Sequence, residues 1–362
     1  MRVVVAMSGG VDSSVSAARL VEAGHEVIGM SLQLWGGGVE VTQGPDHKAD
    51  ARAVCDLLGI PFHIVEGEER FRKTIVDYFI SEYHRGRTPS PCVKCNEEVK
   101  FALLFELADS LGAHAVATGH YARIERGPDG LWRLLRGRDR SRDQSYYLSR
   151  LKQPWLPRVL FPVGDLSKVE VRAQAARIGL PVADKADSQE LCFVADNRYV
   201  DFVEREGGAG VAGDIVDESG RVLGRHGGLC RYTVGQRKGL GIAVGRPLYV
   251  TRLEPATGRV VVGDDAALFH RTLVARDCTW VSGVVPGGPR RVEAKIRYRA
   301  RACPAEVVPG PRGEWHVTFD EPQRAPTPGQ AVVFYDGDEV LGGGWIDDVC
   351  ADPGRSDRPA GP

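Results

Sequence analysis

Two cysteines spaced two residues apart are the first groups in this sequence that could do chemistry. Cys92 and Cys95 lie in TPSPCVKCNEEVKF, and a third cysteine, Cys192, lies in ADSQELCFVAD. Lys94 and the N-terminus of the helix expected after Pro91 favour the thiolate form of the pair. A CxxC pair is either redox-active or half of a zinc site, and the sequence has no second CxxC at zinc-ribbon spacing. The pattern therefore favours sulfur chemistry over a structural zinc ion.

A glycine-rich turn near the start of the chain is the second candidate. SGGVDS, Ser8–Ser13, follows the apolar run RVVVA and precedes a stretch with helical spacing. Backbone N–H groups at such a strand-to-helix turn bind phosphate, helped by the helix dipole. The turn lacks the lysine of a Walker loop and the GxGxxG of dinucleotide sites. It resembles the PP-loop of the ATP pyrophosphatases, which adenylate a carbonyl oxygen; the alternative is an ordinary turn capped by Asp12 or Ser13.

Alternating strand-like and helix-like stretches must position these groups over the first 200 residues or so. The expected strands are RVVVAMS, EVIGMSLQLW, FHIVE and AVATGHYARI, separated by the helices DSSVSAARLVEAGH, DHKADARAVCDLLGI and EVKFALLFELADSLGA. This order predicts an α/β fold with a parallel sheet and helices on both faces. Ligands of such sheets bind at the carboxyl ends of the strands, where both SGGVDS and TGHY stand.

The composition and the element pattern of the sequence change twice after this region. We expect a catalytic PP-loop domain (adenine nucleotide alpha hydrolase-like) over residues 1–206 and a small, mainly β, glycine-rich linking domain over 207–267. Short strands between Pro/Gly turns predict a C-terminal β-barrel over 268–350, and 351–362 is expected to be a disordered tail.

The overall composition is that of a globular protein. The chain has 362 residues, of which 43% are hydrophobic and 26% charged, and its net charge is −1. There is no run of about 18 apolar residues and no signal-peptide pattern, so we expect a cytoplasmic protein without a membrane span.

Two arginine-rich stretches are candidates for an RNA-binding surface. RLLRGRDRSRDQSYY contains arginines at 133, 136, 138, 140 and 142 beside Tyr146 and Tyr147; alternatively it is a solvated loop whose charge Asp139 and Asp143 offset. In VEAKIRYRARA, strand alternation would place Lys295, Arg297, Arg299 and Arg301 on one face. Like charges in one column repel, which favours an anionic partner. The turn YTVGQRKGLG, 232–241, contacts a nucleic-acid backbone or is simply a barrel turn.

The chain as a whole resembles the tRNA-specific 2-thiouridylase family. Matching segments occur in order: SGGVDSSVSA, GRTPSPCVKCNEEVKF, ATGHYARI, RDQSYYLS, LCFV, GQRKGLG, KIRYR, PGQAVVFY and LGGGWI. The resemblance implies that Cys95 is the nucleophile and that Cys192 carries a persulfide, the two forming a disulfide after sulfur transfer. Some members have Asp where this chain has Cys92, which leaves an acid/base role for Cys92 in doubt.

The resemblance also implies the ligands and their contacts. ATP with Mg²⁺ would activate the wobble uridine of tRNAs for Lys, Glu and Gln. The expected ATP-binding residues are Ala6, Met7, Ser8, Gly9, Gly10, Val11, Asp12, Ser13, Leu32 and Gly119. Ser90, Pro91 and Cys92 would meet the target base, and the further expected tRNA contacts are His120, Arg142, Asp143, Gln144, Arg297, Tyr298 and Gln330. The expected partners are the anticodon stem-loop and a cysteine desulfurase or sulfur-carrier protein, with the enzyme a monomer.

Three alternatives remain open from the sequence. Cys92, Cys95 and Cys192 could instead hold a [4Fe–4S] cluster that delivers sulfide, as related thiolases are thought to do. A small-molecule PP-loop amidotransferase or ligase would need no paired thiols. A non-catalytic RNA-binding protein would use the CxxC pair for a structural metal.

Overall fold

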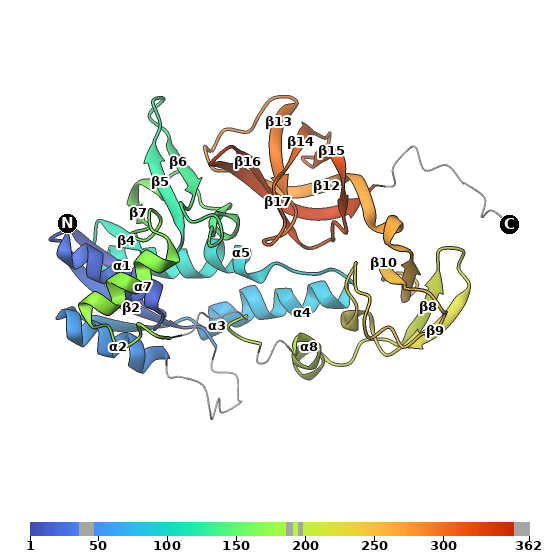
Figure 1. Cartoon of the computed structure of the whole chain (residues 1–362), viewed down its shortest axis with the longest axis horizontal. Helices are drawn as coiled ribbons and strands as arrows, with labels where there is room; N and C mark the ends of the chain where they lie inside the picture. The colour runs from blue at the N-terminus through green and yellow to red at the C-terminus, as the bar shows by residue number, and fades with distance from the viewer. Residues whose placement is uncertain (36–46, 186–190, 195–197, 351–362) are drawn as a thin grey trace.

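The structure is a computed structural model, which describes residues 1–35, 47–185, 191–194 and 198–350. An α/β region lies at one end, a small β region at the other, and a β-barrel lies above the helices that connect them (Figure 1).

A parallel sheet forms the core of the α/β region, as the sequence predicts. Its strands in spatial order are β3 (Phe62–Glu66), β2 (Glu26–Gln33), β1 (Arg2–Ala6), β4 (Ala115–Ala117) and β7 (Val159–Leu160). Val3 and Val5 pack with one buried cluster and Val4 with another, because successive strand side chains face opposite ways. The helices on the two sides are α1 (Val11–Glu22), α2 (His47–Leu58) and α7 (Lys168–Ile178) against α6 (Phe101–Ser110).

The predicted strand AVATGHYARI is wrong as a single element. The structure divides it into β4 and β5 (Ala122–Arg126), with the turn Thr118–Tyr121 between them. The Thr118 hydroxyl lies 2.7 Å from His120 Nδ1 and stabilises this turn. Strand β5 then pairs with β6 (Trp132–Arg136), which joins the sheet of the barrel through β17 (Glu339–Val349). The TGHY turn therefore lies where the α/β region meets the barrel.

Two helices that each contain a π-helical turn carry the CxxC segment and its neighbours. One runs from α3 (Glu68–Phe71) through a π-helical turn, η1 (Arg72–Val76), into α4 (Asp77–His84). The other runs from α5 (Pro91–Cys95) through a second π-helical turn, η2 (Asn96–Lys100), into α6. Cys95 thus lies at the junction of an α-turn and a π-turn. Such π-turns are rare and occur frequently at functional sites.

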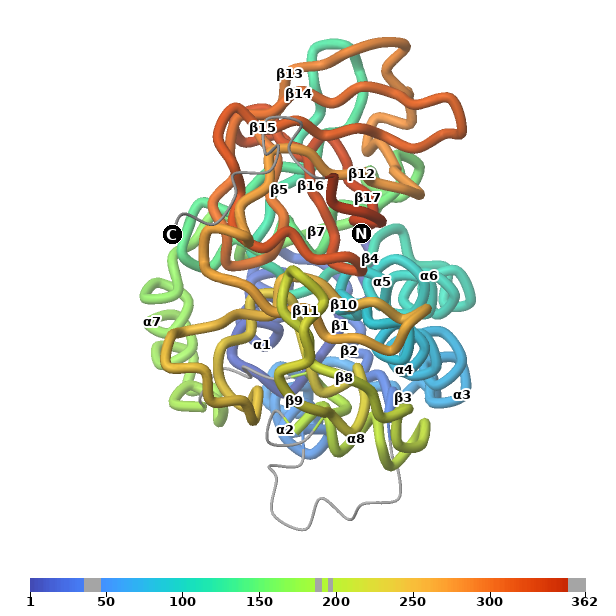
Figure 2. Tube along the Cα trace, turned by 90° about the vertical axis from the view of Figure 1, so that its right-hand side faces the viewer, coloured from blue at the N-terminus to red at the C-terminus, as the bar shows by residue number. Residues whose placement is uncertain are grey.

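The remaining elements form two β domains. The first has β10 (Tyr249–Glu254), β11 (Arg259–Gly263), β8 (Gly213–Asp217) and β9 (Val222–His226) in that spatial order, preceded by α8 (Tyr199–Gly207). The barrel consists of β12 (Phe269–Trp280), β15 (Trp315–Arg324), β14 (Cys303–Pro309), β13 (Arg290–Lys295), β16 (Ala331–Asp336) and β17, and it closes by pairing β12 with β17. In Figure 2, β8–β11 lie in front of the parallel sheet and the barrel lies above.

The predicted alternation in VEAKIRYRARA is wrong beyond Lys295. Strand β13 ends there, and residues 296–302 turn back toward β14. Lys295 is buried, with its ammonium 5.7 Å from the ring centre of Tyr146 and 5.4 Å from that of Tyr298. The basic residues therefore do not form one column on a strand.

Within the described residues, no helix has both the length and the apolar character needed to cross a membrane.

Candidate active site

The glycine-rich turn Ser8–Ser13 connects β1 to α1 at the carboxyl edge of the sheet, as expected. The N-cap of α1 is Gly10, which has no side chain to cap the helix, so the alternative of a turn capped by Asp12 or Ser13 is wrong. The Ser13 hydroxyl instead donates to the Gly10 carbonyl at 3.0 Å and accepts from the Ser8 amide at 3.2 Å. The turn is thus fixed by its own serines, and the start of α1 offers backbone N–H groups to an anion.

Two glycines allow other segments to pack directly on this turn. Gly9 has φ +69°, and a Cβ there would collide with the carbonyl oxygen of His47 at the start of α2. A Cβ on Gly119 would lie 2.6 Å from the Ser13 amide nitrogen. The TGHY turn therefore needs glycine at 119 because it touches the N-terminus of α1. The structure thus brings Gly119 to the predicted nucleotide site, while Leu32 lies half-buried near the end of neighbouring β2.

Lysines from distant segments supply the cations that the turn lacks. Lys168 is buried, and its ammonium donates to both carboxylate oxygens of Asp12 at 2.7 and 2.9 Å. The Tyr121 hydroxyl donates to the same carboxylate at 2.7 Å. Lys185 donates to the Gly9 carbonyl at 2.9 Å and forms an ion pair with Asp50. Sequence reasoning missed all three of these partners, since only the fold brings them to the turn.

The thiols of the three cysteines interact electrostatically, but they are not the thiolates that the sequence predicts. Cys92 and Cys192 reach solvent and Cys95 is buried. The surrounding protein still desolvates all three thiols: it raises the pKa of Cys92 to about 11 and that of Cys95 to about 12, and it raises the pKa of Cys192. Negative charge on Cys192 raises the pKa of both other thiols further. The predicted thiolate at the helix N-terminus is wrong, because desolvation by burial raises the pKa of Cys92 and Cys95.

Lys94 does not activate the CxxC pair either. Its ammonium pairs with Glu98 and lies 5.3 Å from the ring centre of Tyr78. Lys100, which sequence reasoning missed, takes this role. Its charge lowers the pKa of Cys92, Cys95 and Cys192 against the larger effect of burial. The π-turn brings the backbone N–H of Lys100 to the Cys95 sulfur, a placement that an ideal α-helix pattern does not predict.

Lys100 also links the thiols to the TGHY turn. Burial and the charge of Lys100 hold the pKa of His120 well below its usual value, so its imidazole is neutral at pH 7. The His120 ring lies 6.3 Å from that of Phe101, which directly follows Lys100. The predicted nucleotide site and the predicted sulfur site thus share a boundary formed by residues 100–101 and 118–121.

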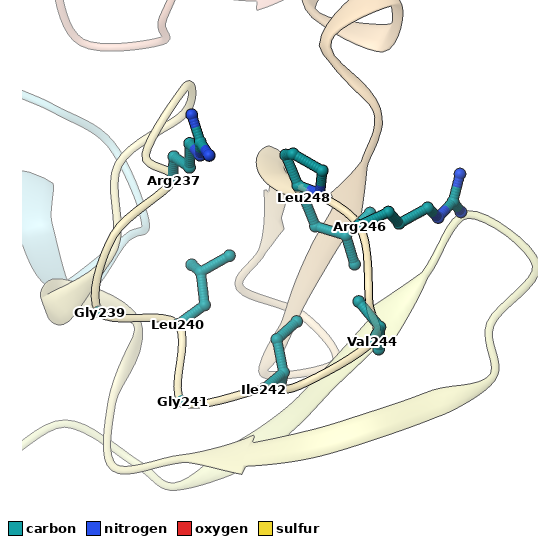
Figure 3. A pocket seen from close by; sticks show the side chains of 9 residues that line it. Arg237, Gly239, Leu240, Gly241, Ile242, Val244, Arg246 and Leu248 are labelled. Atoms are coloured by element: carbon teal, nitrogen blue, oxygen red, sulfur yellow. The ribbon is translucent and has the colours of Figure 1, made fainter.

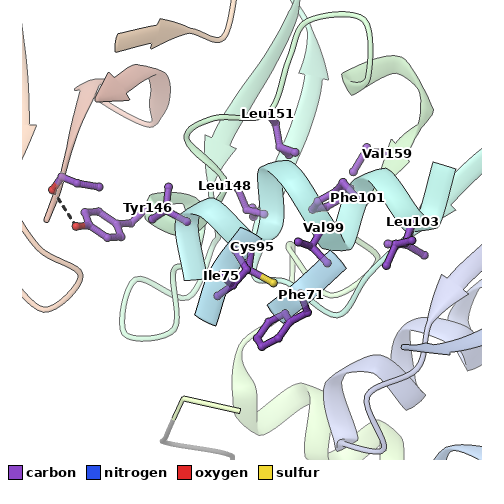
Figure 4. Close-up of a cluster of buried hydrophobic side chains, with 14 of the residues drawn as sticks. Phe71, Ile75, Cys95, Val99, Phe101, Leu103, Tyr146, Leu148, Leu151 and Val159 are labelled. Carbon is purple, nitrogen blue, oxygen red and sulfur yellow. Dashed lines mark hydrogen bonds between the residues drawn. The ribbon is translucent and has the colours of Figure 1, made fainter. Parts of the chain in front are cut away.

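Cys95 lies in a tightly packed apolar cluster. Its neighbours include Phe71, Ile75 and Val99, and Phe193 from the Cys192 segment belongs to the same cluster (Figure 4). The Phe193 ring lies 5.5 Å from the Phe71 ring. Packing of Phe193 therefore holds Cys192 beside the helix that carries Cys95.

The residues expected to contact tRNA divide into buried supports and accessible groups. Ser90 and Pro91 are buried at the start of α5. Asp143 is 4% exposed and accepts hydrogen bonds from Gly137 and Ser145, while Gln144 accepts from the Tyr121 amide at 3.0 Å. These two side chains therefore stabilise the loops around the site.

The accessible groups gather where the barrel meets α5. Tyr147 and Tyr298 stack with ring centres 4.4 Å apart, and negative charge on Cys92 raises the pKa of the Tyr147 hydroxyl. Arg297 is half-buried and donates to the Arg324 carbonyl at 3.0 Å. Tyr146 is buried, and its hydroxyl donates to the Ala331 carbonyl, as the dashed line in Figure 4 marks. Of the two adjacent tyrosines, only Tyr147 can therefore face a base.

The arginines of RLLRGRDRSRDQ are mostly paired within the protein. Arg138 pairs with Glu170, Arg140 with Asp338, and Arg133 with Glu339 at 3.3 Å. Neither interpretation from the sequence anticipated these partners, which tie the segment to α7 and the barrel. Their charges are largely neutralised before any RNA binds.

A hollow in the central β domain is lined by two arginines that differ from those at 133–140. Arg237 and Arg246 stand at its two sides above apolar Leu240, Ile242 and Val244 (Figure 3). Among the described residues, neither arginine has an ion-pair partner. The predicted backbone-contact turn thus offers free positive charge, in contrast to the arginines at 133–140.

The described residues do not fit a metal cluster. No three His, Cys, Asp or Glu side chains in residues 1–35, 47–185, 191–194 and 198–350 lie close enough together to hold a metal ion. The arrangement of Cys92, Cys95 and Cys192 therefore gives no support to the [4Fe–4S] alternative.

Comparison with known proteins places the chain in a class and then in a family. Residues 1–196 match the "tRNA methyl transferase HUP domain" model, residues 200–264 the "tRNA methyl transferase PRC-barrel domain" model, and residues 270–346 the "Aminomethyltransferase beta-barrel domain" model. The parallel sheet with its phosphate-binding turn, followed by two β domains, thus defines an RNA-modifying protein of the PP-loop class. The boundaries expected at 207 and 268 stay predictions.

The relatives give the family. The chain is 54% identical to "tRNA-specific 2-thiouridylase MnmA" of Geobacter metallireducens, covering 96% of both chains. It is 50% identical to the protein of the same name from Solibacter usitatus, over 95% of this chain and 99% of that one. This chain belongs to the tRNA-specific 2-thiouridylase family. The solved "U34-tRNA thiolase NcsA from Methanococcus maripaludis with its [4Fe-4S] cluster" is 20% identical over 53% of this chain and 61% of its own, with a TM-score of 0.34.

Proposed function

We propose that this protein uses ATP to activate the 2-oxygen of the wobble uridine of tRNA and replaces it with sulfur carried as a persulfide on Cys192. The observation that carries the proposal is the shared boundary between the phosphate-binding turn and the three thiols, formed by Lys100 and the TGHY turn. The high identity to the named 2-thiouridylases supports it. A methyl transferase, which the family models' descriptions name, would need neither the paired thiols nor the pyrophosphate-type turn.

The turn at Ser8–Ser13 is suited to the activation step. Backbone N–H groups at the start of α1 hold the phosphates, and Lys185 adds positive charge at Gly9. The carboxylate of the turn, Asp12, is already bonded to Lys168 and Tyr121, so Mg²⁺ would arrive with the phosphates of ATP. Attack of the uridine 2-oxygen on the α-phosphorus forms the adenylate and breaks the bond to pyrophosphate, which leaves.

The thiols are suited to the sulfur step. The terminal sulfur of the Cys192 persulfide attacks C2, and AMP leaves with the former 2-oxygen. The Cys95 thiolate then attacks the Cys192 sulfur, which forms the Cys95–Cys192 disulfide and releases the 2-thio group on the tRNA. Each turnover therefore oxidises two thiols, and a cellular thiol reductant must restore them. Raised thiol pKa values keep Cys95 protonated until the substrate is bound.

The RNA and donor partners follow from the same arrangement. An unpaired anticodon base, turned out of its stack, would reach Cys92 beside the Tyr147–Tyr298 stack. The hollow at Arg237 and Arg246 would contact phosphates of the same RNA. Because Cys192 is exposed, a cysteine desulfurase or a sulfur carrier can load it, and the cytoplasmic location expected from the sequence suits both.

Thiolation of unmodified tRNA in vitro tests the proposal. We expect 2-thiouridine in a transcript with a wobble uridine when ATP, a cysteine desulfurase and cysteine are present, and none when ATP is replaced by an analogue uncleavable between the α and β phosphates. A matched transcript with a wobble cytidine should stay unmodified. Thiolation without ATP, or ATP cleavage that ignores tRNA, would favour a different PP-loop reaction.

A further inference from the structure

A buried lysine lies beside the tyrosine stack at the edge of the sulfur site. Lys295 ends β13 and pairs with Val333 of β16 in the barrel. It is 7% exposed, and a lysine is almost never buried to this extent without a partner. Yet no oxygen atom in the part of the chain that the structure describes accepts a hydrogen bond from its ammonium. Another kind of contact must therefore stabilise the buried charge.

Two aromatic rings make that contact. The Lys295 ammonium lies 5.7 Å from the ring centre of Tyr146 and 5.4 Å from that of Tyr298. A cation is attracted to the face of an aromatic ring, most strongly where water is excluded. Burial lowers the pKa of Lys295, and the negative charge of Asp143 acts against this change and favours the ammonium form. The lysine thus joins the two rings electrostatically.

The two rings differ in how firmly the protein holds them. Tyr146 is 1% exposed, and its hydroxyl donates to the Ala331 carbonyl at 2.9 Å. Tyr298 is half-buried in the turn that follows β13, with its ring centre 6.2 Å from that of Tyr146. Within residues 1–35, 47–185, 191–194 and 198–350, the Tyr298 hydroxyl forms no hydrogen bond. Lys295 therefore holds the Tyr298 ring against a ring that the barrel already fixes.

The position of Tyr298 in turn sets that of Tyr147. The two rings stack with an interplanar angle of 29° and ring centres 4.4 Å apart. From the other side, the Asn96 side chain donates to the Tyr147 carbonyl at 3.0 Å, and Asn96 directly follows Cys95. The stacked tyrosines thus connect the end of β13 to the helix that carries the CxxC pair.

We propose that Lys295 is a positioning residue, which holds the Tyr298 ring, and through it Tyr147, where an unpaired base meets Cys92, and which does not itself contact RNA. This inference deepens the proposed function, and its rate measurements rest on that function. The hydrogen-exchange measurement below needs no RNA and does not rest on it.

The first test replaces the lysine in the full-length protein. Lys295→Met keeps the length and removes the charge, whereas Lys295→Arg keeps a cation for both rings. At saturating tRNA, we expect Lys295→Met to lower the single-turnover thiolation rate about tenfold and Lys295→Arg to stay within about threefold of the wild type. Arg291→Met is the control, because Arg291 lies exposed on the same strand and pairs with Asp320 at 2.6 Å. It should keep the full rate.

The salt dependence of tRNA binding separates positioning from direct contact. Each phosphate contact that is lost lowers the slope of log Kd against log salt by about one. The slope should be the same for Lys295→Met as for the wild type. A slope reduced by about one would overturn the proposal and make Lys295 an RNA contact.

A double-variant cycle asks whether Lys295 acts through the Tyr298 ring. Tyr298→Leu should lower the thiolation rate at least as much as Lys295→Met does. Adding Lys295→Met to Tyr298→Leu should then cost less than about a further twofold, because the ring that the lysine positions is gone. A double variant whose loss equals the product of the two single losses would overturn the proposal.

Hydrogen exchange in the free enzyme tests the positioning itself. Peptides from residues 296–302 should exchange several-fold faster in Lys295→Met than in the wild type, while peptides from β12 and from the central β domain stay unchanged. Lys295→Gln is a second uncharged variant if Lys295→Met does not fold. Unchanged exchange at 296–302, or faster exchange throughout the barrel, would contradict a local positioning role. If the wild type does not thiolate tRNA, the proposed function fails, and the exchange still decides whether Lys295 holds this turn.

Discussion

The nucleotide side and the sulfur side of this site are built in opposite ways. At Ser8–Ser13, charged and polar groups are bonded to one another: Asp12 accepts from Lys168 and Tyr121, and Lys185 donates to the Gly9 carbonyl. At Cys95, apolar side chains surround the sulfur and hold its thiol neutral. A preorganised polar site binds ATP at once, whereas a desolvated thiol stays unreactive until a substrate arrives. In the proposed reaction, this difference would place activation before sulfur transfer.

Removal of the cation that pairs with Asp12 on the nucleotide side should have the largest effect on activity. Lys168→Met leaves the Asp12 carboxylate facing the phosphates without its countercharge. We expect tRNA-dependent release of pyrophosphate from ATP to fall about 100-fold, equivalent to about 2.7 kcal/mol. The rate of Cys92 alkylation should not change. Arg177→Met, which removes the exposed ion pair of the same helix with Glu22, is the control and should keep full activity.

The apolar side predicts slow thiol chemistry in the free enzyme. With a pKa of about 11, Cys92 should react with iodoacetamide at pH 8 about 20-fold more slowly than free cysteine, after allowing for the greater nucleophilicity of a more basic thiolate. Because the neutral form is favoured, its rate should rise through pH 10 without the plateau of an ordinary thiol. Peptide mass spectrometry across pH 7–11 measures this, and a plateau near pH 9 would show that burial does not control the thiol.

Lys100 lies between the nucleotide side and the sulfur side, so its loss should slow both thiolation and thiol alkylation. Lys100→Met removes the cation that opposes the pKa rise of all three thiols. We expect thiolation to fall about tenfold and Cys92 alkylation at pH 8 to slow by a similar factor. Lys94→Met is the matched control, because Lys94 pairs with Glu98 and should leave alkylation unchanged. Equal effects of both variants would mean that general charge, not placement, matters.

The smallest effect belongs to the RNA-binding surface away from both sides. Arg237→Ser and Arg246→Ser should each weaken tRNA binding about threefold and reduce the slope of log Kd against log salt by about one. Arg221→Ser in the same domain removes an arginine already paired with Asp217 at 3.1 Å and should change neither value. Slopes that do not differ among the three variants would remove the hollow from the RNA surface.

The same contrast explains what the sequence could predict. The turn at Ser8–Ser13 and the parallel sheet follow from local order, because a strand, a glycine turn and a helix are consecutive. The partner of Asp12 is 156 residues away, and the carboxylate that pairs with Arg140 is 198 residues away, so no spacing pattern indicates them. The raised thiol pKa values depend on burial, and the cluster that buries Cys95 with Phe71 and Phe193 forms only in the packed fold. Local helix rules therefore predict a lowered thiol pKa at Cys92, whereas the packed fold raises it.

The fate of the cysteines in a single turnover tests the central claim most directly. Enzyme loaded with sulfur by a desulfurase is mixed with excess unmodified tRNA and ATP without reductant, quenched with acid, and analysed by non-reducing peptide mass spectrometry. We expect the persulfide on Cys192 to disappear and one Cys95–Cys192 disulfide to form for each 2-thiouridine. Formation of 2-thiouridine while Cys95 and Cys192 both stay reduced would contradict the account.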